Sequence, residues 1–355
     1  MNAAARRYVL LALGLAVGLA GGLALLNYLV DPYNRFGLNR LGVYISADRE
    51  FKATEVRRYP HNALLVGNSR MGVVQPEQLN GFRFFNGAFA GATAEEAYYF
   101  IAHFARTQEL VILSVDPGAG DPAELKGDIF GPASCTAILN NLFNLQTVEY
   151  SFRTISEHLA GIPDPMRADG STDMAFWLKT ADQDRPAYRD WQLELLKRGY
   201  ATSLTNVTKA GMSSYKRIRQ CLQERRILCV VWVPPLHEAI AQHLQTQPAV
   251  AAAYQHWKQE LKAIFPYVVD LSGSSYCAHE NFFGSDPAHF RAEAGARMLN
   301  AEVIPAALRM LREGTNTVKH VLRGADGTER GPSPPAPARR TARSGADEGR
   351  FFPAG

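Results

Sequence analysis

An uncharged segment near the N-terminus constrains this chain more than any other feature. Residues 8–30 are 23 positions without a charged side chain, enough to cross a hydrocarbon core of about 30 Å at about 1.5 Å per residue. Arg6 and Arg7 precede the segment and favour a cytoplasmic N-terminus over residues 1–7. We therefore predict a transmembrane anchor over residues 8–30; a cleaved signal peptide is the alternative.

Charge is distributed unevenly along the remaining chain. The formal net charge is +4. Residues 314–355 hold seven basic and four acidic side chains, so they carry +3 of it. The rest is nearly neutral and lacks the basic balance of a nucleic-acid-binding domain. Because residues 314–355 are rich in Gly, Pro and Ala and offer little to bury, we expect a disordered tail there.

Short apolar runs alternate with helix-like stretches after a polar connector at residues 31–60. Alternation of this kind is typical of a parallel sheet covered by helices on both faces. It predicts an α/β, flavodoxin-like three-layer sandwich with about five strands over residues 61–313, together with one N-terminal transmembrane helix. The expected strands are 63–67, 82–86, 110–115, 227–233 and 267–271, and the expected helices are 93–106, 207–226, 237–264 and 290–312.

Residues 118–205 do not follow the alternation. An insertion after the third strand would lie at the carboxyl edge of the sheet, where open α/β folds bind ligands. We expect either a cap over that edge or a plain packing subdomain.

The cysteines and histidines favour neither a metal site nor a cofactor. The four cysteines, Cys135, Cys221, Cys229 and Cys277, show no C-x-x-C spacing. Cys229 lies in an apolar run and is interpreted as a buried free thiol, while disulfide pairing stays open. His279 and Glu280 lack a third ligand at a recognisable spacing.

Two short motifs suggest chemistry. Ser69, in Gly67-Asn68-Ser69-Arg70, directly follows the first expected strand, so its hydroxyl would lie at the open edge of the sheet. Asp286, in Asp286-Pro287-Ala288-His289, precedes the last helix. Its spacing lets the carboxylate hold one imidazole nitrogen of His289 while the other faces a serine. Each motif alone is weak, but together they predict a triad of Ser69, His289 and Asp286.

In this order along the chain, the motifs resemble those of the SGNH (GDSL-like) hydrolase superfamily. Gly67-Asn68-Ser69 is similar to its first block, and the last block matches Asp286 and His289. The run from Asn86 to Thr93 (NGAFAGAT) is similar to its second block. The resemblance implies that the backbone N–H groups of Ser69 and Gly91 form the oxyanion hole.

The third block of the superfamily departs from the pattern. Where it supplies an asparagine, this chain has Asp116, which cannot donate a hydrogen bond when ionised. The anchor makes the chain more similar to membrane-bound relatives that acylate envelope polymers, such as alginate O-acetylation and D-alanyl transfer proteins. Asp116 and three further residues are candidates for substrate binding: Arg70, Asn86 and His237. For Arg70 the alternative is a solvated arginine at a helix start, and for His237 it is a histidine at a helix start without such a role.

The resemblance implies acyl transfer through an acyl-Ser69 intermediate, with acetyl as the group, an envelope or exopolysaccharide as acceptor and a polytopic membrane acyltransferase as donor. It also implies a single-pass protein of a bacterial inner membrane with a periplasmic catalytic domain and no cofactor. Two alternatives remain open: a periplasmic esterase or deacetylase, and a non-catalytic component that binds polymer or assists assembly.

Overall fold

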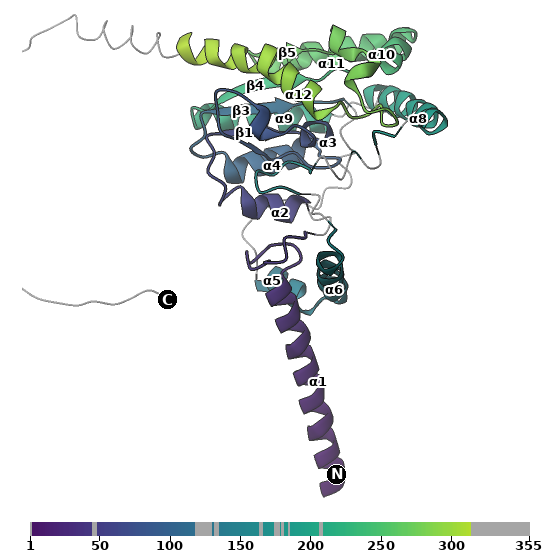
Figure 1. Ribbon diagram of the computed structural model, residues 1–355. Coiled ribbons are helices and arrows are strands. Elements are labelled where there is room, and N and C mark those ends of the chain that lie inside the picture. The colour runs from purple at the N-terminus through teal and green to yellow at the C-terminus, as the bar shows by residue number, and fades with distance from the viewer. Residues whose placement is uncertain are drawn as a thin grey trace, which may run out of the picture. The chain divides into compact units, whose positions relative to one another are not determined.

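Five short apolar segments form one parallel sheet. The computed structural model describes residues 2–44, 48–117, 130, 135–162, 166–173, 178, 181–183, 185–205 and 209–313. Its strands pair in the order β2-β1-β3-β4-β5, every pair parallel, as in flavodoxin-like folds (Figure 1). The predicted fold class is confirmed. The strands are β1 Ala63–Val66, β2 Phe84–Asn86, β3 Leu110–Ser114, β4 Leu228–Val233 and β5 Val268–Asp270.

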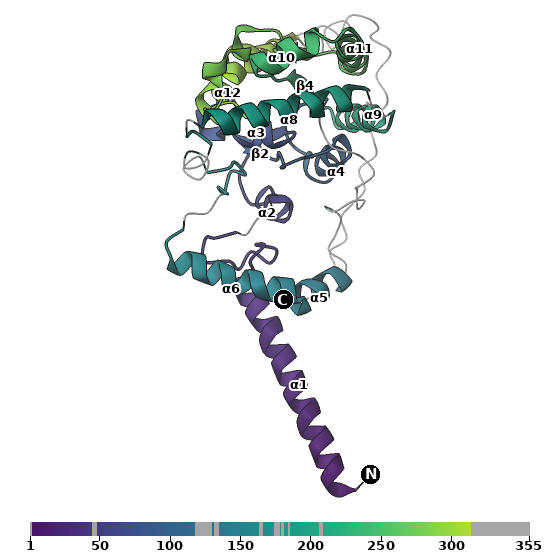
Figure 2. The same cartoon turned by 90° about the vertical axis from the view of Figure 1, so that its right-hand side faces the viewer.

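Helices cover both faces of the sheet. Alternate strand residues such as Leu64 and Val231 pack against one helical layer, and their neighbours Leu65 and Trp232 pack against the other. Figure 2 shows α3 and α12 on one side of the strands and α4, α9 and α11 on the other. Because both faces are covered, β1, β3 and β4 are nearly continuous apolar runs rather than alternating with polar residues. The helices are α3 Ser69–Gly72, α4 Ala94–Phe104, α8 Pro186–Thr205, α9 Lys209–Glu224, α10 Glu238–Gln245, α11 Pro248–Ile264 and α12 Ala292–Met298.

Two helix boundaries differ from the sequence prediction. The stretch 237–264 is two helices, α10 and α11, because Pro248 begins the second one and has no backbone N–H to continue the first. The last helix runs from residue 292 to 313 but contains a π-helical segment, Leu299–Val303. Short 3₁₀ turns complete the described structure: Pro76–Gln78, Ser275–Cys277 and His279–Asn281.

The N-terminal segment forms one helix, α1 Ala3–Val30, of 28 residues. It is long and apolar enough to cross a membrane, and most of its large apolar side chains are exposed. Its C-terminal part contacts two helices of the predicted insertion, α5 Cys135–Phe143 and α6 Leu145–Leu159. These two helices therefore lie against α1, whereas α8, from the same insertion, packs on α10 and α11.

The predicted connector 31–60 is partly folded into the sandwich. It contains α2 Asp48–Glu55, whose Phe51 and Lys52 are buried. Val56 belongs to the core on the α4 side of the sheet. The predicted disordered tail, 314–355, lies outside the described residues.

Candidate active site

The serine turn is shaped by a glycine that no other residue replaces easily. Gly67 has φ 154°, and a Cβ built on it would lie 2.7 Å from the Cβ of Ser114 and 2.9 Å from its carbonyl oxygen. The chain can therefore pass close to the end of β3 as it leaves β1. Asn68 then accepts a hydrogen bond from the Arg70 N–H and starts α3 at Ser69. The half-buried Ser69 side chain thus lies just beyond the carboxyl end of β1.

Three distant residues meet at this turn. His289 Nε2 lies 2.9 Å from Ser69 Oγ, and His289 Nδ1 lies 2.8 Å from Asp286 Oδ2. With Nδ1–H donating to the carboxylate, Nε2 is the acceptor that faces the serine hydroxyl. The predicted convergence of the three side chains is confirmed.

The loop carrying Asp286 and His289 is held by its own backbone and by the insertion. Asp286 Oδ1 accepts from the Ala288 N–H at 3.1 Å, which leaves Oδ2 for the imidazole. Ser285 donates through both its backbone N–H and its hydroxyl to the Ala181 carbonyl. Arg291 pairs with Asp182 at 2.7 Å. Part of the predicted insertion therefore supports the site from the side.

The second predicted oxyanion donor, Gly91, lies on an exposed turn with φ 61° between β2 and α4. Among the described residues its N–H donates to no protein acceptor. Thr93 and Glu96 form a capping box at the start of α4, immediately after this turn. The role of Gly91 in oxyanion binding stays a prediction.

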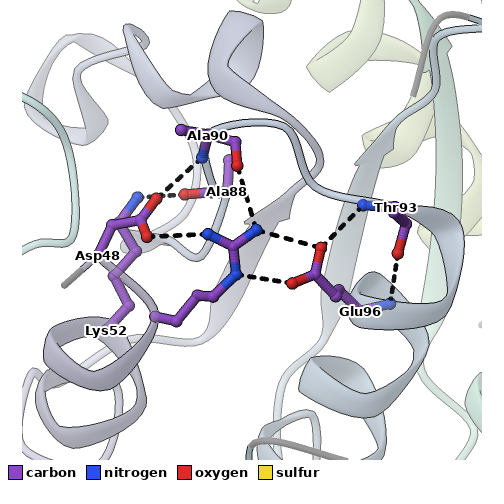
Figure 3. Close-up of polar contacts among 7 residues, drawn as sticks. Asp48, Lys52, Ala88, Ala90, Thr93 and Glu96 are labelled. Carbon is purple, nitrogen blue, oxygen red and sulfur yellow. Dashed lines mark hydrogen bonds and ion pairs between the residues drawn. The ribbon is translucent and has the colours of Figure 1, made fainter. Parts of the chain in front are cut away.

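Helix α2 holds the turn that carries Gly91 (Figure 3). Asp48 accepts a hydrogen bond from the Ala90 N–H at 2.9 Å, and Arg49 donates to the Ala90 carbonyl at 3.1 Å. Arg49 also pairs with Glu96 at 2.6 Å, and Lys52 donates to the Ala88 carbonyl. Burial lowers the pKa of Lys52 to about 8. These contacts were missed from the sequence, where α2 fell within the connector.

Arg70 and Asp116 form a buried ion pair. Their side chains are 5% and 3% exposed, and Arg70 Nη1 lies 3.0 Å from Asp116 Oδ2. Asp116 also accepts from the Tyr200 hydroxyl at 2.8 Å, and Arg70 donates to the Pro235 carbonyl. Neither the predicted substrate contact nor the solvated alternative for Arg70 fits this burial. Asp116 likewise has its carboxylate occupied by protein partners, so both residues are assigned a structural role.

Asn86 is also structural rather than a substrate ligand. Its side chain is fully buried and donates to the carbonyls of Met71 and Val74, both at 2.9 Å, while its Oδ1 accepts from the Ala88 N–H at 3.1 Å. A buried amide with these partners has no free group for a ligand. Asn86 instead links α3 and the residues just after it to the start of the Gly91 turn.

His237 occupies the helix-start position that was its alternative reading. Its Nδ1 accepts from the Ala239 N–H at 3.2 Å and caps α10, and its Nε2 lies 3.0 Å from His279 Nδ1. Burial, with repulsion from His279, lowers the pKa of His237 to about 4. Because the ring is 4% exposed and both nitrogens are engaged, direct substrate contact does not fit this residue.

A small hollow lies beside the serine turn, between the ends of β1 and β3 and the start of α4. Gly67, Asn68, Thr93, Ser114 and Asp116 contribute to its lining, and its empty space is about 250 Å³ including the part open to solvent. Ser114 Oγ is buried there without a hydrogen-bond partner among the described residues. Ser69 itself does not line this hollow.

The four cysteines all lie in the described part of the chain and are free thiols. The predicted buried thiol at Cys229 is confirmed, and burial raises its pKa to about 12. Among the described residues, no cluster of three or more His, Cys, Asp or Glu side chains could hold a metal ion. Comparison with models of protein families and with curated proteins gave no match to this chain.

Proposed function

We propose that this protein is a membrane-anchored serine acyltransferase that works through an acyl-Ser69 intermediate. The observation that carries the proposal is the hydrogen-bonded series from Ser69 Oγ through His289 to Asp286, at 2.9 and 2.8 Å. A serine hydroxyl with a base at this distance, and a carboxylate behind the base, is the arrangement that nucleophilic acyl transfer needs.

In the first half-reaction, His289 Nε2 removes the Ser69 proton as Oγ attacks the acyl carbonyl of the donor. Asp286 stabilises the imidazolium that forms. The tetrahedral oxyanion is bound by the backbone N–H groups of Ser69 and Gly91. When the donor's leaving group departs, it takes the proton from His289 and leaves acyl-Ser69.

In the second half-reaction, the hydroxyl of the acceptor gives its proton to His289 and attacks the acyl carbon. Collapse of the tetrahedral intermediate forms the new ester and returns the proton to Ser69 Oγ. Water in place of the acceptor would give hydrolysis, so the same residues also support the esterase alternative.

The superfamily resemblance supports an acetyl group, a polysaccharide acceptor and a polytopic membrane acyltransferase as donor. The length and composition of α1 support an anchor, and we place the catalytic domain in the periplasm, outside a bacterial inner membrane.

The departure at Asp116 is compatible with this chemistry. A free carboxylate beside an oxyanion would repel it, but the charge of Asp116 is compensated by Arg70 at 3.0 Å. The pair therefore removes the main objection to an active site in which aspartate replaces the asparagine of the superfamily.

Fluorophosphonate labelling of the full chain in detergent tests the nucleophile. We expect a single covalent adduct on the unmodified chain and none on Ser69→Ala, with Ser274→Ala as the matched serine control that still labels. Equal labelling of the unmodified chain and Ser69→Ala would refute the proposal. Turnover of an aryl acetate with and without a glycan acceptor then separates transfer from hydrolysis, because only a transferase gives an acylated glycan.

A further inference from the structure

Helices α5 and α6 expose an apolar surface away from the active site. The exposed fractions are 76% for Leu145, 59% for Phe152 and 80% for Leu159. Exposed apolar surface on this scale marks a site of interaction with a partner or a membrane. The α5–α6 apolar face consists of Leu139, Phe143, Leu145, Phe152, Leu159 and Ile162.

Helix α6 does not bury an apolar stripe as an ordinary surface helix does. Its buried positions are Thr147, Ser151 and Thr154, all polar. Leu145 and Phe152 follow each other at a spacing of seven, which places them on one stripe of the helix. The exposed positions of α6 combine this apolar stripe with polar residues such as Glu149, Arg153 and Ser156, as expected for a helix that lies at a boundary between an apolar and an aqueous phase.

That packing partner is the end of α1. Asn27 is 1% exposed; it donates to the Leu142 carbonyl and accepts from the Ser151 hydroxyl, both at 2.9 Å. These bonds satisfy an amide that would be costly to expose to hydrocarbon. Figure 2 shows α5 and α6 crosswise at this end of α1.

The exposed apolar surface of α1 extends to its C-terminal end, where α5 and α6 pack. Leu25 and Leu29, on either side of Asn27, are 56% and 59% exposed. If α1 crosses a bilayer, its last turns lie where hydrocarbon gives way to lipid headgroups. An apolar face fixed beside those turns reaches the same lipid, which favours a bilayer over a protein as its occupant.

We propose that α5 and α6 lie in the interface of the membrane that α1 crosses, with the α5–α6 apolar face inserted among the lipid acyl chains. This inference rests on the anchor part of the proposed function and not on its chemistry. The helices then act as a second membrane contact, so that the domain meets the membrane through a surface as well as through a single span.

Site-specific photocrosslinking of the full chain tests the inference. p-Benzoylphenylalanine is placed singly at Leu145, Phe152 or Leu159, and each protein is reconstituted into vesicles of phosphatidylethanolamine and phosphatidylglycerol. We expect lipid adducts by mass spectrometry at each position, as at the α1 control Leu19. The matched control Leu195, a 48% exposed leucine on α8, should give none.

Adducts at Leu19 without adducts at the three α6 positions would overturn the inference, and covalent dimers in their place would assign the surface to a second copy. Absence of adducts at Leu19 would overturn it by removing α1 from the membrane. Using three separate positions guards against one misfolded variant. Fluorophosphonate labelling of the same samples reports on the catalytic proposal independently.

Discussion

The substitution Asp116→Asn is a sharp test, because the structure and the superfamily pattern predict opposite effects for it. The pattern suggests that Asp116→Asn would restore an oxyanion donor and raise activity. The structure predicts a loss of stability instead, because Arg70 would keep a buried charge without its partner. Both side chains are at most 5% exposed, and the ion pair is 3.0 Å long.

The expected loss follows from the burial of the pair. Removing one partner of a buried ion pair typically costs about 3–5 kcal/mol. An asparagine oxygen can still accept from Arg70 and from Tyr200, so we expect the lower end, about 3 kcal/mol. At about 2–4 °C per kcal/mol for a domain of this size, the melting temperature should fall by about 6–12 °C.

The assay is thermal unfolding of the full chain in detergent, followed by circular dichroism. Asp190→Asn is the matched control, since Asp190 is 71% exposed and lies 3.8 Å from Arg189; an exposed pair of this kind contributes about 0–1 kcal/mol. The double variant Arg70→Met with Asp116→Asn should lose less stability than the two single losses combined. A melting temperature for Asp116→Asn within about 2 °C of the unmodified chain would refute the reasoning, as would a gain in acyl-transfer rate.

Three further predictions follow from the site. Asp286→Asn should lower aryl acetate turnover by about 10⁴, because the amide favours the wrong tautomer of His289; an unchanged rate would exclude a triad. Arg49→Ala should lower kcat by up to about 10²–10³, the loss typical of one oxyanion donor, with little change in KM, because it releases the Gly91 turn; a change in KM alone would contradict that role. Lys52→Met should be more stable than the unmodified chain, with the full difference below about pH 8 and a shrinking difference as the pH rises to about 10.5. Folded Lys52 loses its proton at a pKa of about 8, whereas a free lysine has a pKa of 10.5. The unfolded chain therefore binds more protons between about pH 8 and pH 10.5, and the stability of the unmodified chain rises with pH over that range. Melting temperatures of both chains over that range check it, and a constant difference would contradict it.

The strands were the most predictable part of the fold. Ala63–Val66 and Leu110–Ser114 differ from their predicted ranges by one residue at one end, because a strand buried on both faces is a continuous apolar run bounded by polar or turn residues. The break between α10 and α11 before Pro248 could also have been predicted from the sequence, because the helical conformation is disfavoured for the residue that precedes a proline. It was missed because the apolar pattern continues on both sides of the break.

The site was predictable where its chemistry is local. Asp286 and His289 are three positions apart, and Ser69 stands directly after a strand. The supporting contacts were not predictable, because they join segments that are distant along the chain. Arg70 and Asp116 are 46 positions apart, and nothing near either residue reveals that both become buried.

The placement of α5 and α6 against α1 could likewise not be predicted from the sequence. Their sequence predicts amphipathic helices, but it does not say which side faces the protein. The contacts of Asn27 with Leu142 and Ser151 decide that question, and they join residues more than a hundred positions apart.

The separation of 220 positions between Ser69 and His289 has a consequence for folding during synthesis. During synthesis the serine emerges long before its base, so a growing or truncated chain carries an ordinary alcohol at that position. If Ser69 reacts as proposed, it does so only after the segment that carries His289 has docked beside the first strand. In the proposed mechanism, a nascent chain cannot form acyl-Ser69 until the segment that carries His289 has been made and has docked.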